Sequence, residues 1–278
     1  MIDLHVHTTA SDGRSSPEEL VTEVVGAGIR TVAVTDHDTT EAIEAVSVAA
    51  EPHGLEVVPG IEITAVDDGR DIHVLGYFVD TAHDDLAQFL SRQREDRRRR
   101  LFEIIAVLDR LGVPIDTAPL MAAAAGHRSV GRPLVAAALV EAGHVRDIGD
   151  AFDQFLAEGR PAFVARRGAS PTDVIGQIHG AGGLASLAHP GKTDVDTRIA
   201  ALARSGLDAI EVFHPDHDEE TGSRYRRMAR DLDLLVTGGS DYHGPRSGRD
   251  QALGRVGLPA PDFDRLRLRL GQTRGSRD

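Results

Sequence analysis

The 278-residue chain contains no cysteine, no tryptophan and three tyrosines. The absence of cysteine excludes disulfides, thiolate-bound zinc, iron–sulfur clusters and cysteine nucleophiles. Eight phenylalanines do not predict an extended surface for stacking bases, although recognition of one or two nucleosides needs only one or two apolar faces. Lysine is scarce too, since Lys192 is the one lysine among 31 basic residues.

The charge balance narrows the class of ligand. There are 31 basic and 44 acidic residues, and the net charge of −13 argues against a binder of duplex DNA. It leaves room for a small anion held by a few local cations or metal ions. No run of 18 apolar residues and no basic, apolar leader is present, so we expect a cytoplasmic protein that needs neither a membrane nor an obligate protein partner.

Hydrophobic patterning predicts an α/β protein in two parts around a helical insertion. Short apolar runs alternate with amphipathic stretches, which is typical of βα units and a parallel sheet closing into a barrel. Between 93 and 160 the pattern is helical without a clear strand. The predicted divisions are 1–92 and 168–278 for the barrel and 93–167 for the insertion, with strands near 2–6, 31–35, 55–59, 72–78, 184–187, 209–213, 234–237 and 255–258. The arginine run at 97–100 is expected to be a solvated helix face, and the alternative is a cap that covers an anionic ligand.

Histidines and carboxylates follow the predicted strands. His5 and His7 share one face of a strand end because side chains alternate with period two. In a parallel barrel the carboxyl ends of all strands open on one face, so residues far apart in the chain converge there. The candidates of this kind are His5, His7, His37, Glu62, His73, His189, Asp241 and His243.

Such a donor set predicts a hydrolytic metal site. Imidazoles and carboxylates without thiolates suit Mn, Fe or Zn, whereas Mg prefers oxygen ligands. So many ligands are too many for one ion and suit two or three divalent ions. Water held by such ions has its pKa lowered toward ~7, which supplies a hydroxide nucleophile.

The motifs MIDLHVHTTASDG, AVTDHDT, PGIEIT, HVLGY, SLAHPGK and TGGSDYHG resemble the PHP (polymerase and histidinol phosphatase) superfamily. This resemblance implies a distorted (β/α)7 barrel, and phosphoester hydrolysis by a metal-bridging hydroxide. It also adds Asp12 to the ligands. The implied groups are His5, His7, Glu62 and Asp241 for one ion, Glu62, His73 and His189 for a second, and Asp12, His37 and His243 for a third.

The insertion narrows the expected substrate. The stretches GRPLVAAALVEAGHV and DQFLAEGRPAFV resemble stand-alone PHP phosphoesterases of small nucleotides, so a nucleoside 3′,5′-bisphosphate or 5′-AMP is the expected substrate. The alternatives are a 5′→3′ exoribonuclease acting on short RNA, a cyclic-phosphate phosphodiesterase, a histidinol phosphatase, and a metal-binding protein without turnover.

Four further residues are expected to serve the substrate. Lys192, Arg132 and Arg128 are candidate phosphate contacts because phosphate oxygens need donors. His214 follows a predicted strand and is a candidate general acid or phosphate donor. Together with Asp241, His214 is the expected catalytic pair.

Overall fold

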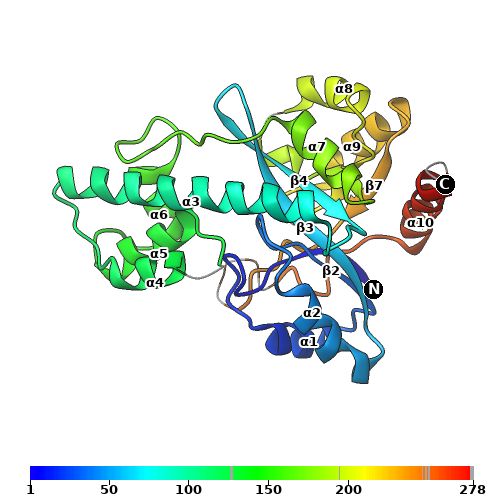
Figure 1. The fold of residues 1–278 in the computed structure, drawn as a ribbon, viewed down its shortest axis with the longest axis horizontal. Helices are drawn as coiled ribbons and strands as arrows, with labels where there is room; N and C mark the ends of the chain where they lie inside the picture. The colour runs from blue at the N-terminus through cyan, green and yellow to red at the C-terminus, as the bar shows by residue number, and fades with distance from the viewer. Residues whose placement is uncertain (126–127, 194, 246, 248, 250, 276–278) are drawn as a thin grey trace.

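A computed structural model of the chain describes residues 1–125, 128–193, 195–245, 247, 249 and 251–275. Seven strands form one sheet in chain order, and the sheet nearly closes on itself because Val6 bridges Tyr242 beyond the last strand. The expected α/β barrel is confirmed (Figure 1). The strands are β1 (Ile2–Val6), β2 (Thr31–Val34), β3 (Glu56–Asp67), β4 (Arg70–Tyr77), β5 (Leu184–Leu187), β6 (Ala209–Phe213) and β7 (Leu235–Gly238).

One strand departs from the expected parallel sheet. β4 runs antiparallel to both β3 and β5. The turn between β3 and β4 has positive φ at Asp68 (49°) and Gly69 (80°), the backbone of a type I′ hairpin, which Asp-Gly favours. The hairpin sets Thr64 opposite His73, so His73 lies diagonally across from Glu62.

Helices cover the outside of the barrel, and two of them start as their sequence predicts. Ser16 and Ser170 each form a capping box, followed by a proline at the first helical position. The strand expected at 255–258 is wrong, because a turn ends at Arg255 and the residues after it are irregular, although the Leu258 amide donates to the Ile2 carbonyl (2.8 Å). The barrel helices are α1 (Pro17–Gly26), α2 (Ile43–Ala50), α7 (Pro171–Gly180), α8 (Asp196–Arg204), α9 (Glu219–Asp231) and α10 (Ala260–Gly275).

The helix α3 joins the barrel to the insertion (Figure 1). Its 27 residues span about 40 Å. Phe89 and Leu90 pack into the barrel core, whereas Ile104 and Leu108 pack into a separate core of the insertion. The expected division at residue 93 therefore falls inside one continuous helix. The insertion comprises the C-terminal part of α3 (Asp84–Arg110), α4 (Ala118–Ala125), α5 (Arg132–Glu141), α6 (Ile148–Ala151) and a π-helical turn (Phe152–Leu156).

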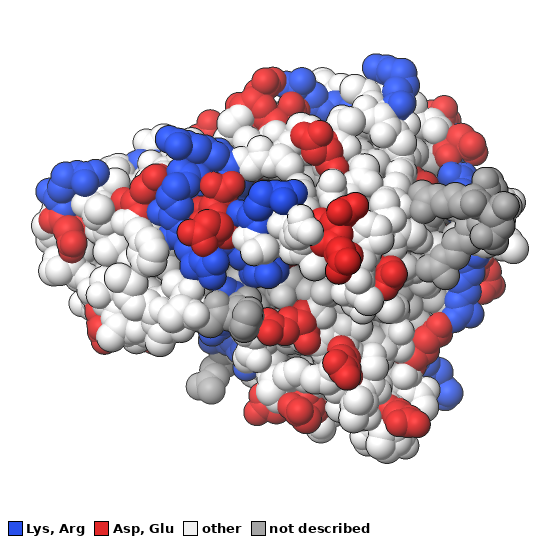
Figure 2. Space-filling view, in the orientation of Figure 1, with Lys and Arg blue, Asp and Glu red and all other residues white. Residues whose placement is uncertain are grey.

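The arginine run on α3 divides into two pairs. Arg98 and Arg99 lie on the surface in ion pairs with carboxylates of the same helix, where basic and acidic side chains intermingle (Figure 2). Arg97 and Arg100 point inward and are 6% and 4% exposed. The expectation of a solvated face is thus wrong for Arg97 and Arg100. Among the described residues no helix is both long enough and apolar enough to cross a membrane.

Candidate metal centre

The structure brings all nine expected ligands together at one end of the barrel. They form four overlapping groups in which the candidate ligand atoms lie within 4.8 Å of one another. The groups are His7, Asp12, His37 and His243; His5, His7 and Asp241; His5, Glu62 and His189; and His37, Glu62 and His73.

Glu62 occupies the middle of this cluster. Its Oε2 lies 3.3 Å from the Nε2 atoms of His5 and His7, and its Oε1 lies 2.7 Å from His73 Nδ1. His189 Nε2 also approaches Oε1, at 3.1 Å. Contacts to both oxygens are those of a carboxylate that can bridge two ions. The groups differ from the expected ones in that His73 joins His37, and His189 joins His5.

Two candidate ligands have unusual backbone conformations. His189 and Asp241 have φ angles of 27° and 51°, in the left-handed region that residues with a Cβ rarely adopt. Strained positions of this kind persist only where the surroundings hold them, and they concentrate at functional sites. Both come within three residues of the end of a barrel strand, and both belong to the ligand groups.

The donor atoms fit divalent ions. Buried polar atoms nearly always have a hydrogen-bond partner. Among the described residues ten buried side-chain atoms lack one, and five of these ten belong to the nine candidate ligands. They are Nδ1 and Nε2 of His7, Oδ1 of Asp12, Nδ1 of His37 and Nδ1 of His189. Bound ions would give a partner to those that face the cluster, at most one nitrogen of each imidazole.

The imidazoles differ in how they hold protons. Burial lowers the pKa of His189 to about 4, and Lys192 adds to the effect. Burial also opposes protonation of His7, but the carboxylates of Asp241 and Glu62 outweigh it and raise the pKa of His7 to about 10. Near neutral pH His189 is therefore ready to bind an ion, whereas His7 must first release a proton.

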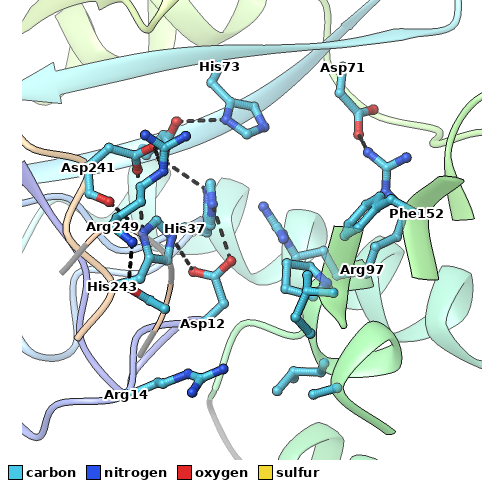
Figure 3. Close-up of a pocket in the computed structure, with 18 of the residues that line it drawn as sticks. Asp12, Arg14, His37, Asp71, His73, Arg97, Phe152, Asp241, His243 and Arg249 are labelled. Carbon is cyan, nitrogen blue, oxygen red and sulfur yellow. Dashed lines mark hydrogen bonds and ion pairs between the residues drawn. The ribbon is translucent and has the colours of Figure 1, made fainter. Parts of the chain in front are cut away.

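A cavity of about 720 Å³ opens from the cluster toward the insertion. This volume is within the range of sites for small ligands. Figure 3 shows Asp12, His37, Asp241 and His243 on one side of the cavity and Arg97, Asp71 and Phe152 on the other. The cavity thus has an end made by the candidate ligands and an end made largely by arginines and by apolar residues of the insertion.

Asp71 organises the arginine end. Its Oδ2 accepts from Arg132 Nη2 (3.1 Å) and Arg100 Nη1 (3.2 Å), and its Oδ1 lies 3.5 Å from Arg166 Nε. Burial opposes ionisation of Asp71, but the three guanidinium groups, that of Arg166 most strongly, outweigh it and lower the carboxyl pKa to about 2. Asp71 is accordingly a fixed anion that holds three cations.

The arginines outnumber the carboxylates that hold them. Arg97 forms an ion pair with Asp38, and Arg166 lies 4.0 Å from the same carboxylate. With Arg100 and Arg132 the cluster contains four guanidinium groups and, with Asp71, two carboxylates among the residues that the structure describes. Arg166 is 8% exposed on its side chain, and its Nε has no hydrogen-bond partner. Burial and the nearby Arg97 lower the pKa of Arg166 to about 9. The cluster therefore has an excess of positive charge, which a bound anion would offset.

Three of the four residues expected to contact substrate line the cavity. These are Lys192, Arg128 and Arg132. Lys192 Nζ lies 3.9 Å from Asp241 Oδ2, at the ligand end, and Arg132 lies at the arginine end. Arg128 Nε donates to the Ser11 carbonyl (2.6 Å), which ties the insertion to the loop after β1.

His214, the fourth of these residues, lies behind the cluster. It is 3% exposed and is not among the described residues that line the cavity. Its Nδ1 accepts from the Asp216 amide (3.1 Å), so the hydrogen of the neutral ring is on Nε2, which faces Asp241 Oδ2 at 3.3 Å. This geometry orients Asp241.

Sequence reasoning missed several residues of the site. Arg249 Nε lies 3.1 Å from Asp241 Oδ2, and its Nη2 donates to Asp216 (2.7 Å). Arg249 and Arg166 lie outside helices and strands, where no periodicity marks them. Arg97 could have been found, because Gln93, Arg97 and Ile104 recur at helical spacing on the buried face of α3.

A carboxylate that could bridge two ions, surrounded by imidazoles and with a cationic cavity beside it, is the site of a metal-dependent phosphoesterase, a hydrolase. Comparison with known proteins agrees. Residues 3–128 match the PHP domain model. A 5′-3′ exoribonuclease from Haemophilus influenzae is 35% identical over 87% of the chain and 90% of its own length. The chain therefore belongs to the PHP domain family.

Two further relatives support this assignment. A 3′,5′-nucleoside bisphosphate phosphatase from Chromobacterium violaceum is 31% identical over 90% of both chains. A solved structure described as a candidate metal-dependent phosphoesterase from Bifidobacterium adolescentis superposes with a TM-score of 0.86 and 32% identity, over 95% of this chain and 94% of that one. The relatives share the class of reaction but carry different names for the activity.

Proposed function

We propose that this protein hydrolyses the 3′-phosphate monoester of a nucleoside 3′,5′-bisphosphate, using two or three divalent ions. The observation that carries the proposal is that one cavity joins the candidate ligands to a second cluster of positive charge. A nucleotide with a single phosphate would leave one end of this cavity without an anion.

The nine imidazole and carboxylate ligands fit Mn, Fe or Zn better than Mg. Such ions act as Lewis acids toward phosphoryl oxygens and lower the pKa of water. Glu62 would be shared between ions because both of its oxygens contact imidazoles. His214 would hold Asp241 in position by donating from Nε2.

Lys192 and Arg249 are the donors proposed for the scissile phosphate. Both side chains line the cavity beside Asp241. In the reaction the oxygen of water bonds to phosphorus, the P–O3′ bond breaks, and the O3′ atom leaves as a hydroxyl after gaining a proton. The side chains of Lys192 and Arg249 would orient the phosphate and offset the charge that develops on its oxygens.

Arg97, Arg132 and Arg166 are the donors proposed for the 5′-phosphate. Asp71, which anchors this cluster, is two residues from His73 on β4, and their Cα atoms are ~7 Å apart. Neighbouring side chains on one face of β4 thus support the two ends, an arrangement that one nucleotide could bridge. Phe152 in the wall of the insertion offers an apolar face for the base.

A second candidate activity is exonucleolytic cleavage of short 5′-phosphorylated RNA. The similarity to the Haemophilus influenzae exoribonuclease favours it. Such RNA also carries a 5′-phosphate next to a 3′-phosphoester, so both ends of the cavity would be used in the same way. 5′-AMP has no 3′-phosphate, and we expect it to be a poor substrate.

The test is product release with Mn²⁺ from adenosine 3′,5′-bisphosphate, 5′-AMP and a 5′-phosphorylated RNA trimer in parallel. We expect the bisphosphate to give AMP and phosphate with a kcat/KM about 10- to 100-fold above that of 5′-AMP. This ratio corresponds to the free energy of one charge-assisted hydrogen bond to the second phosphate. Equal or faster hydrolysis of 5′-AMP would overturn the assignment of the arginine end. Faster turnover of the RNA would make exonucleolytic cleavage the main activity.

A further inference from the structure

Glu211 is a buried carboxylate that belongs to none of the ligand groups and does not line the cavity. It is the third residue of β6, and its exposed fraction is 0%. Each of its two oxygens contacts a different candidate metal ligand, His5 through Oε1 and His189 through Oε2. We infer that Glu211 is a positioning residue that fixes both ligands and thereby sets the affinity of the site for metal.

The contact to His5 selects the ring nitrogen that can bind an ion. Glu211 Oε1 lies 2.9 Å from His5 Nδ1. An ionised carboxylate only accepts, so the hydrogen of the neutral ring is on Nδ1. The Nε2 atom is then free of hydrogen and faces Glu62 (3.3 Å) and Asp241 (3.5 Å), among the other ligands. Partners of this kind fix the tautomer and the orientation of metal-binding histidines.

The contact to His189 holds a strained backbone. The His189 amide donates to Glu211 Oε2 at 2.8 Å. This is the residue whose φ is 27°, and Pro190 follows it directly. The rings of His5 and His189 are stacked with centroids 5.8 Å apart. The carboxylate of Glu211 therefore holds two neighbouring candidate ligands in place, His5 from β1 and His189 from the segment after β5.

Glutamate meets this requirement and glutamine does not. Two donors, His5 Nδ1–H and the His189 amide, need two acceptor oxygens, and a carboxylate supplies both. A glutamine has one acceptor oxygen and an NH₂ group. If its oxygen keeps the His189 amide, its NH₂ faces His5 Nδ1, and the ring hydrogen must move to Nε2, the atom that would bind the ion.

The chain contains a matched control at the other end of the barrel. Asp208 Oδ2 contacts the ring of His179 (2.7 Å) and accepts from the Ala185 amide (2.8 Å). It thus makes the same kinds of contact as Glu211, but neither of its partners is a candidate ligand. Replacing Asp208, whose side chain is 13% exposed, reports what the loss of a largely buried, hydrogen-bonded carboxylate does to folding alone.

The experiment compares Glu211→Gln and Asp208→Asn with the wild type by titrating metal-free protein with Mn²⁺, without substrate. We expect the Mn²⁺ Kd of Glu211→Gln to rise about 10- to 100-fold, and that of Asp208→Asn to stay within threefold. Saturating Mn²⁺ should restore kcat of Glu211→Gln with little change in KM, which a distorted fold would not allow. An unchanged Kd for Glu211→Gln, or an equal rise in both variants, would overturn the inference.

A measurement on the wild type covers the case in which Glu211→Gln does not fold. In the Zn²⁺-loaded protein, ¹⁵N NMR of the imidazoles should find His5 protonated at Nδ1. Protonation at Nε2 would overturn the inference. The Mn²⁺ titration and the NMR measurement use no nucleotide, so the wrong choice of substrate under the proposed function would leave both results unaffected.

Discussion

His73 and Asp71 lie two residues apart on β4, and their side chains therefore point to the same side of the strand. His73 Nδ1 contacts Glu62 at 2.7 Å, inside the candidate metal centre. Asp71 accepts from Arg132 at 3.1 Å, inside the arginine cluster. A single strand thus supports both ends of the cavity and fixes the distance between them.

Replacing Arg132 separates substrate recognition from the reaction. Arg132→Gln removes one donor from the arginine end, while Arg100 and Arg166 still hold Asp71. We expect kcat/KM for adenosine 3′,5′-bisphosphate to fall about 10- to 100-fold, and that for p-nitrophenyl phosphate to change less than threefold. Arg98→Gln, at an exposed ion pair with Glu95, is the control without effect. Equal losses on both substrates would contradict the proposed role.

Removing a candidate ligand should abolish the reaction. Asp241→Ala and His189→Ala each remove one candidate metal ligand. We expect phosphate release to fall to background, together with the amount of bound metal measured by elemental analysis. His144→Ala is the control, because His144 contacts the Pro114 carbonyl within the insertion. Activity of either ligand variant within tenfold of the wild type would refute the metal centre.

Metal binding should release protons. In the metal-free protein the pKa of His7 is about 10, so His7 is protonated near pH 7.5. It loses this proton when a metal ion binds to the ring. His189, with a pKa of about 4, contributes none. Affinity for Mn²⁺ should therefore increase as pH rises toward 9. Calorimetry in buffers of different ionisation enthalpy measures the protons directly, and a value of zero at pH 7.5 would exclude this protonation scheme.

Asp71 should stabilise the fold in a pH-dependent way. Its pKa is lowered from 3.8 to about 2, so its contribution is complete above pH 4 and is lost as pH falls through 2. Asp71→Asn removes the anion that pairs with Arg100 and Arg132, and we expect it to lower the free energy of unfolding by about 3 kcal/mol at pH 7. Urea unfolding at pH 7 and at pH 2.5 gives the comparison. A difference between wild type and variant that does not shrink at the lower pH would assign the loss to another cause.

Most of the ligand end could be predicted from the sequence because eight of the nine ligands follow or lie in a short apolar run. His5 and His7 follow from the period of a strand, and others follow from the rule that barrel strands open on one face, whereas Asp12 rests on the resemblance to the PHP motifs. His73 reaches the centre differently, through the hairpin at Asp68 and Gly69. An Asp-Gly pair between apolar runs is a hairpin signal, so this turn was also open to prediction.

The arginine end could not be predicted in the same way. Arg166 and Arg249 lie in irregular segments, and their positions depend on how the insertion packs against the barrel. Arg97 and Arg100 recur at helical spacing on the buried face of α3, but this spacing does not show that they contact Thr64 of β3 and Asp71 of β4. Glu211 did carry a local signal, since it is an acidic residue inside the apolar strand AIEVF.

A crystal structure of the Mn²⁺-loaded protein with AMP and inorganic phosphate, the products of bisphosphate hydrolysis, is the most direct test of a cavity with two anion-binding ends. We predict the 5′-phosphate of AMP at Arg97, Arg132 and Arg166, and the free phosphate beside Asp241, Lys192 and Arg249. A 5′-phosphate of AMP bound among the nine metal ligands, with the arginines paired only to Asp38 and Asp71, would contradict the assignment.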